Sequence, residues 1–221
     1  MSKDILIPKM TRLDKKKKRI KTPLINVVAI LFGTLLIIAA TFLNLEIKHY
    51  ILPSGLFTHK PLTPEDYVYS FCLIPQIPVV MFVCSVLGKK MALTSVFLYI
   101  IAGLFFIPVF ALGGGLKYFG QYGFGYILAY IPAVFIAGNI LKKKYSFPKM
   151  IKAAIFGVLT IHILGILYMI VIALIKQSGL TFIEGWINAQ SGLKILYDII
   201  TSFILILIGK YFNEGLRYLL R

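Results

Sequence analysis

Long apolar runs separated by short charged clusters constrain this chain more than any other feature of its sequence. A helix needs about 20 mostly apolar residues to cross the roughly 30 Å hydrocarbon core of a bilayer. Six segments meet this requirement: Leu24–Leu43, Tyr67–Leu87, Met91–Leu112, Tyr122–Leu141, Met150–Ile175 and Gly192–Phe212. The second and third are separated only by the turn at 88–90. The sequence therefore predicts an all-α integral membrane bundle of six transmembrane helices.

The loops between these runs differ in positive charge. The chain carries 24 Lys and Arg against 8 Asp and Glu, and 19 of the 24 fall on the N-terminal side when the helices alternate across a membrane. Because Lys and Arg are enriched in cytoplasmic loops, we expect both termini to be cytoplasmic. The chain then has a basic cytoplasmic tail (1–22), a six-helix transmembrane domain (23–214) and a cytoplasmic C-terminal tail (215–221). We expect a multi-pass protein of the cell (inner) membrane.

The N-terminal basic stretch allows two interpretations. The run Lys15–Arg19 either only sets the topology or also binds anionic lipid headgroups, at about 1 kcal/mol for each charge near the surface. The apolar run after it has no small-x-small cleavage site, so we expect a retained helix and an intact N-terminus. Since the positive charges form clusters between apolar runs, we expect membrane lipid, and not nucleic acid, as a partner.

Motifs of hydrolytic and nucleotide-binding enzymes are absent from the sequence. It contains no Gly-x-Ser-x-Gly, no His-Glu-x-x-His and no P-loop. Cys72 and Cys84 lie in one apolar segment and have neither the spacing of a metal site nor the pattern of a disulfide framework. We therefore expect a protein that is not an enzyme and that uses no metal or cofactor.

A few polar side chains lie inside the apolar runs. Gln76, Tyr126, Tyr168 and Asp198 come from four different predicted helices, and all belong to the outer half of the membrane. Pro75 and Pro78 flank Gln76 and remove backbone donors, so we expect the second helix to be kinked or unwound there. Irregular backbone at membrane depth is tolerated only against protein or a polar cavity. The sequence thus predicts one polar site open to the exterior.

Asp198 is the strongest single candidate. A lone carboxylate in a spanning helix costs about 2.5–3.5 kcal/mol on insertion scales, so it should be paired, protonated or turned to a cavity. Lys194 and Thr201 stand at i−4 and i+3 on the same helical face. The two charges either only neutralise each other, or the whole face binds one small molecule through an acceptor, a cation and a hydroxyl.

His162 lies alone in the fifth predicted helix. A single intramembrane histidine is usually a hydrogen-bonded packing residue, although polar groups at such depth are also functional candidates. An intramembrane lipid-modifying enzyme with Asp198 and His162 as acid and base is a further hypothesis. It requires the two side chains to touch, whereas the predicted topology places His162 well deeper than Asp198.

Three stretches resemble the BioY family of biotin-transport proteins. They are Ala92–Gly103, read as ALTSVFLYIIAG, Ile107–Gly115, read as IPVFALGGG, and Phe124-Gly125-Tyr126. The similarity runs from about residue 74 to 138 and resumes more faintly in the last two helices. Members of this family are the substrate-binding components of energy-coupling factor importers, so the resemblance implies biotin capture from the outer side.

The resemblance also implies roles for single residues. Gln76 matches a glutamine of the family, Gly113, Gly114 and Gly115 match its glycine loop beside the ligand, and Tyr126 matches its Gly-Gly-Tyr tyrosine. Asp198 matches the aspartate of a Pro-Gly-Asp-Leu-x-Lys motif that holds biotin. Here Thr201 stands in place of the family's lysine, so we expect Lys194 to supply the missing cation.

The chemistry of biotin fits these expectations. Its two ureido N–H donors need acceptors such as Asp198 or Gln76. Its sulfur ring is apolar and would pack on Phe110, Tyr126 or Tyr168. Its valerate anion needs Lys194 or the N–H groups of the glycine loop, and the 44–66 loop would cover the ligand. The Thr201 departure leaves open another small anionic vitamin or heterocycle as the substrate.

A chain without a nucleotide site depends on partners for energy. The resemblance implies a separate membrane coupling protein and two ATPase subunits. Family members dock through their first helix, where Ala29 and Gly33 have here a small-xxx-small spacing that permits close helix contact. Ordinary packing within the bundle explains the same spacing equally well.

Overall fold

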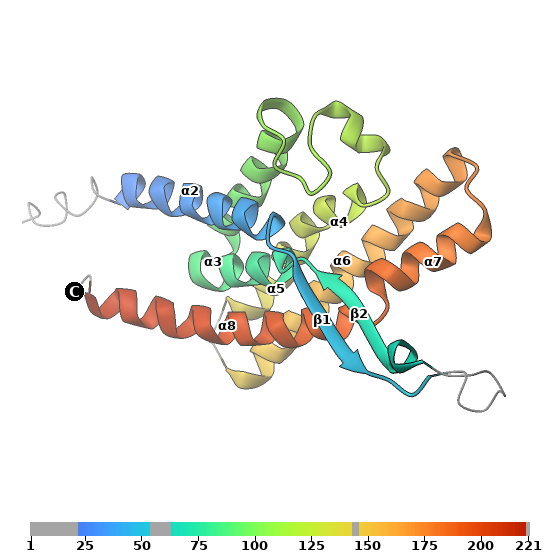
Figure 1. Ribbon diagram of the computed structural model, residues 1–221. Coiled ribbons are helices and arrows are strands. Elements are labelled where there is room, and N and C mark those ends of the chain that lie inside the picture. The colour runs from blue at the N-terminus through green and yellow to red at the C-terminus, as the bar shows by residue number, and fades with distance from the viewer. Residues whose placement is uncertain (1–21, 54–62, 143–145, 220–221) are drawn as a thin grey trace, which may run out of the picture.

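The computed structural model describes residues 22–53, 63–142 and 146–219 (Figure 1). The Lys15–Arg19 run and most of the 1–22 tail lie outside these residues, as do the middle of the 44–66 loop and His59. The elements follow in the order α2 (Thr22–Thr41), β1 (Leu45–Tyr50), η2 (Pro64–Tyr67), β2 (Val68–Leu73), α3 (Gln76–Ile101), η3 (Ala102–Phe106), η4 (Leu116–Gly120), α4 (Phe124–Leu128), α5 (Tyr130–Leu141), α6 (Phe147–Ile175), α7 (Leu180–Ser191) and α8 (Lys194–Leu219).

The described part of the chain is mostly helical and contains five helical stretches long and apolar enough to cross a membrane. These are Leu24–Thr41, Gln76–Phe106, Phe124–Leu141, Phe147–Ile175 and Leu180–Asn213. Length and composition thus give five candidate spans where the sequence predicted six. The difference arises because the second and third predicted helices form one continuous helical stretch.

Helix α3, which makes up most of that stretch, folds back on itself at Gly88. Gly88 has φ 75° and ψ 168°, a backbone conformation that is essentially restricted to glycine. Gln76 and Tyr99 would lie about 35 Å apart on a straight helix, yet Gln76 Nε2 donates to the Tyr99 hydroxyl at 2.6 Å. The two halves of α3 are therefore antiparallel, and the turn falls where the sequence predicted a hairpin.

The segment before α3 differs from the prediction of helix from Tyr67 onward. Tyr67 ends the 3₁₀ turn η2, and residues 68–73 form β2, which pairs antiparallel with β1 in the register Leu45↔Leu73. Pro75 is the N-cap of α3, since proline is tolerated at a helix start but not in its interior. The fold is thus helical with one small two-stranded sheet, and is not purely α.

Three other boundaries also differ. The third predicted helix, Met91–Leu112, ends earlier, in the π-helical turn η3, and the fourth is interrupted at Ala129 between α4 and α5. The stretch predicted as a loop before the last helix forms α7, whose one buried residue is Ser191. Figure 1 shows α6 and α7 extending together at one side of the molecule.

The helices α2, α5 and α8 all pack against α3 (Figure 1). A Cβ on Gly33 of α2 would meet Ser95 Oγ at 2.9 Å and Val83 Cγ1 at 3.1 Å, so this glycine lets α2 lie close to α3. Its placement agrees with packing within the bundle, while Ala29 is half-buried. Large apolar side chains on the outer faces of α2 and α6 are exposed, as expected for helices surrounded by lipid.

Candidate functional site

A cavity of about 320 Å³ lies where α3 and α8 begin, between these helices, α4, α6 and α7. Four residues that the sequence selected line it together: Gln76, Tyr126, Lys194 and Asp198. They come from α3, α4 and α8, far apart in the chain. Of the four polar groups expected to share one site, Gln76, Tyr126 and Asp198 line this cavity and Tyr168 does not.

Asp198 contacts His162, which also lines the cavity. Asp198 Oδ2 lies 3.2 Å from His162 Nε2, and the side chains are 4% and 1% exposed. The expectation that His162 lies well deeper than Asp198 was wrong. The depth was counted from the outer end of α6, but α6 has 29 residues, about 43 Å, and it extends with α7 at one side of the molecule (Figure 1).

The other oxygen of the Asp198 carboxylate is free. Asp198 Oδ1 is buried and has no hydrogen-bond partner among the described residues. Among the described residues Lys194 forms no ion pair with it within 4 Å, and the Lys194 ammonium donates to Gln190 Oε1 at 3.4 Å. A simple Lys194–Asp198 pair, one of the two interpretations of this face, is thus not what the structure contains. A buried oxygen without a partner is costly, so a donor on a ligand would stabilise it.

Gln76 has a fixed orientation. Its Nε2 donates to Thr41 Oγ1 at 2.8 Å and to Tyr99 OH at 2.6 Å, while its Oε1 accepts from Tyr130 OH at 2.9 Å. Both amide hydrogens are therefore used by the protein. Toward the cavity Gln76 can offer only the remaining lone pair of Oε1, which makes it an acceptor.

The remaining predicted site residues lie outside the cavity lining. Phe110 is buried behind it, with its ring 4.6 Å from that of Tyr118, which does line the cavity. Tyr168 donates to Phe119 O at 2.5 Å, and Thr201 Oγ1 donates to Tyr197 O within α8. None of these three groups faces the cavity directly.

The glycine run closes a loop instead of facing the cavity. Gly113 and Gly115 have φ 110° and 85°, which glycine adopts without strain. Gly115 N donates to Gly103 O at 2.8 Å, and a Cβ on Gly114 would meet that same carbonyl at 2.6 Å. The run therefore lets the loop before η4 lie against η3.

A family model decides the assignment of the chain. The model of the BioY family matches residues 14–218. The chain belongs to the BioY family. The resemblance seen in residues 92–126 is thereby confirmed.

Two curated relatives are similar to this BioY-family chain. The biotin transporter BioY of Thermotoga maritima is 32% identical over 114 residues, which are 51% of this chain and 63% of the relative. A protein named probable biotin transporter BioY, from Lysinibacillus sphaericus, is 27% identical over 154 residues, 66% of this chain and 74% of the relative. The match thus spans less than two thirds of the Thermotoga protein's length.

A solved structure shares the fold. It is the crystal structure of the S-component for biotin from an ECF-type ABC transporter, with a TM-score of 0.61 and 22% identity. The alignment covers 93% of this chain and 95% of that chain. At this identity the likeness extends to the fold alone.

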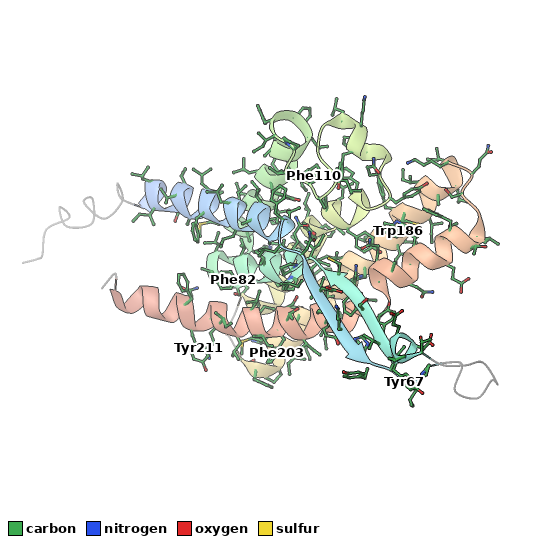
Figure 2. The ribbon with its side chains drawn as sticks, viewed as in Figure 1. Tyr67, Phe82, Phe110, Trp186, Phe203 and Tyr211 are labelled. Carbon is green, nitrogen blue, oxygen red and sulfur yellow. The ribbon has the colours of Figure 1, made fainter. Side chains whose placement is uncertain are left out.

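Several lining residues of this BioY-family chain were missed in the sequence. Trp186 and Gln190 come from α7, Tyr130 from α5, and Tyr118 and Gln121 from η4 and the residue after it. Figure 2 labels Trp186 on α7. The sequence did contain a signal for Trp186, because it is the one Trp of the chain and lies in a stretch predicted as a loop. Burial raises the pKa of the Tyr118 phenol above its ordinary value.

Proposed function

We propose that this BioY-family chain is the substrate-binding membrane subunit of an importer and captures biotin from the outer side. The observation that carries the proposal is the polarity of the cavity. Asp198 and Gln76 offer acceptors, while Lys194 supplies a cation one helical turn away on α8. The relative from Thermotoga is named a biotin transporter and that from Lysinibacillus a probable biotin transporter, which supports the same substrate.

The ureido ring of biotin would lie at the acceptor end. It presents two N–H donors, and Asp198 Oδ1 and Gln76 Oε1 are two acceptors with free lone pairs. A hydrogen bond to a carboxylate is about twice as strong as one between neutral groups. This arrangement favours a ligand with N–H donors over one that presents oxygen atoms.

The rest of biotin would extend toward α7. The sulfur ring would pack on Tyr126 and Ile77, and the valerate carboxylate would bind Lys194, whose backbone lies about 6 Å from that of Asp198 along α8. Lys194 then takes the role of the family's lysine, whose position is occupied by Thr201 in this chain. Phe110, Tyr168 and the glycine run would support this site from behind instead of touching the ligand.

For the membrane arrangement we propose six crossings, because the fold-back of α3 at Gly88 divides one of the five apolar stretches into two. The start of α2 and the end of α8 both lie at the left of Figure 1, which supports two termini on one side. The positive charges place that side in the cytoplasm. The cavity then opens outward, as capture of external biotin requires.

Transport would need separate subunits. The chain has no nucleotide-binding motif, and the structure that shares its fold is a component of an ECF-type ABC transporter. We therefore propose a membrane coupling protein and ATPase subunits as partners. The contact between Asp198 and His162 satisfies the distance that an acid–base enzyme would need, but the BioY family consists of transporter subunits, so enzyme activity is not proposed.

Equilibrium binding tests this function. Radiolabelled biotin is titrated against the purified protein, the Asp198→Asn variant, and Glu184→Gln as a control for an exposed carboxylate on α7 outside the cavity lining. Losing a charge-assisted hydrogen bond costs about 1.5–3 kcal/mol, so Asp198→Asn should bind on the order of 10- to 100-fold more weakly, while Glu184→Gln should match the wild type. If biotin does not bind, direct binding of a panel of labelled anionic vitamins identifies another substrate.

A further inference from the structure

Four polar side chains form one hydrogen-bonded chain at the cavity. Tyr126 OH lies 2.6 Å from Ser191 Oγ, and Ser191 Oγ lies 2.9 Å from His162 Nδ1. His162 Nε2 then lies 3.2 Å from Asp198 Oδ2. The chain joins α4, α7, α6 and α8 in turn. Neither the family motifs nor the direct ligand contacts proposed above account for Ser191 and His162.

The hydrogens of this chain can run in one consistent direction. The phenol of Tyr126 has Ser191 Oγ as its hydrogen-bond partner within the described residues, and a phenol is a good donor. If Tyr126 donates to Ser191, the single hydroxyl hydrogen of Ser191 goes to His162 Nδ1. A neutral imidazole that accepts at Nδ1 carries its hydrogen on Nε2, which then donates to Asp198.

We infer that His162 is a positioning residue: the chain from Tyr126 through Ser191 and His162 holds Asp198 Oδ2, so that Oδ1 remains as a fixed acceptor for an N–H group of the ligand. This inference rests on the proposed function for the identity of the ligand. Oδ1 is buried and without a partner among the described residues. Because Oδ2 is already engaged, the carboxylate cannot rotate freely to follow a ligand.

The chain also links this acceptor to α7. Ser191 is the one buried residue of α7, and it bonds to both His162 and Tyr126. The same helix brings Trp186 and Gln190 to the cavity. The Asp198 carboxylate is therefore oriented when α7 lies in the position that the structure gives it.

The first test reads the tautomer of His162 without any ligand. Protein labelled with ¹⁵N-histidine is measured by NMR at neutral pH, and His162→Gln identifies the signal among the three histidines of the chain. The inference requires a hydrogen on Nε2, which donates to Asp198 Oδ2. A ring with its hydrogen on Nδ1 and none on Nε2 has no donor for Asp198 and overturns the inference whatever the protein binds.

The second test measures discrimination between ligands. Biotin is compared with two analogues, each methylated on one ureido nitrogen. For the analogue that blocks the Asp198 contact, we expect on the order of 100-fold weaker binding to the wild type, as for loss of a hydrogen bond to a charged group. Ser191→Ala should reduce that ratio by about fivefold or more, chiefly by weakening biotin. His162→Gln, which keeps an N–H donor, should retain more of the ratio than His162→Phe.

The matched control is Ser202→Ala on α8. Ser202 is also a fully buried serine, but its hydroxyl has no partner within the described residues and it is not part of the cavity lining. It should leave both affinities unchanged. If Ser191→Ala loses affinity equally for biotin and the analogue, or loses none, the hydrogen-bonded side chains have only a structural role. If the wild type does not bind biotin, the proposed function is refuted. The tautomer of His162 then still tests the hydrogen-bonded chain from Tyr126 to Asp198.

Discussion

A methyl group added at Gly165 should weaken ligand binding without removing any polar group. Gly165 lies on α6 against the ring of Tyr126, and a Cβ there would meet ring carbons Cγ and Cδ2 at 2.5 Å. Ordinary van der Waals contact begins at 3.4 Å, so the ring must move by about 0.9 Å. If the whole displacement fell along the bond to Ser191, the distance from the Tyr126 hydroxyl to Ser191 Oγ would rise from 2.6 Å to at most about 3.5 Å, beyond a normal hydrogen bond.

The size of the effect follows from two costs. Losing one neutral hydrogen bond costs about 0.5–1.5 kcal/mol, and overpacking a close-packed interior costs about 1–3 kcal/mol. Only the share of these free-energy costs that distorts the cavity lowers the affinity for the ligand. We therefore expect Gly165→Ala to bind biotin roughly 5- to 50-fold more weakly, at about 1.4 kcal/mol for each factor of ten. Thermal unfolding should shift downward at the same time.

The assay is saturation binding of labelled biotin to purified variants. Gly185→Ala is the matched control, because a Cβ at Gly185 on α7 meets nothing within 4 Å. Combining Gly165→Ala with Tyr126→Leu should give much less than the sum of the two single effects, since the clash disappears with the ring. Wild-type affinity in Gly165→Ala, or full additivity in the double variant, would refute the placement of Tyr126 beside the ligand.

Three further predictions concern the turn, the cation and the topology. Gly88→Ala should lower the melting temperature by roughly 3–10 °C, because φ 75° and ψ 168° cost another residue about 1–3 kcal/mol; an unchanged melting curve would contradict the turn. Lys194→Gln should weaken biotin but not its neutral methyl ester, whereas Lys117→Gln, outside the cavity lining, should weaken neither; an equal effect on acid and ester would remove Lys194 from the site. A membrane-impermeant maleimide applied to intact spheroplasts should label the exposed Cys72 and spare the buried Cys84, and labelling of Cys72 only after lysis would reverse the proposed orientation.

Much of the helical frame could be predicted because apolar length is a strong signal. The hairpin at Gly88 was also readable, since glycine and two lysines interrupt an otherwise continuous apolar run. The β1–β2 hairpin was missed because β2, read as VYSFCL, is apolar enough to extend a predicted helix toward Tyr67. Helix α7 was missed because residues 180–191 are too short and too polar to resemble a membrane span.

The candidate site was only partly readable. Membrane energetics singled out Asp198 and Gln76, because an isolated polar group is costly there, and both line the cavity. Phe110 and Tyr168 were expected to touch the ligand, but the side of a helix or loop that faces a cavity depends on packing that the sequence does not encode locally. The depth of His162 was misjudged because helix ends were assumed to lie at a common level, whereas α6 extends past the start of α8 (Figure 1).

A structure of the protein with biotin bound tests the central claim most directly. The account predicts a ureido nitrogen within about 3.2 Å of Asp198 Oδ1, a normal hydrogen-bond distance, with the valerate carboxylate directed toward Lys194. Biotin bound in the reverse orientation, or outside the cavity between α3, α6 and α8, would contradict it.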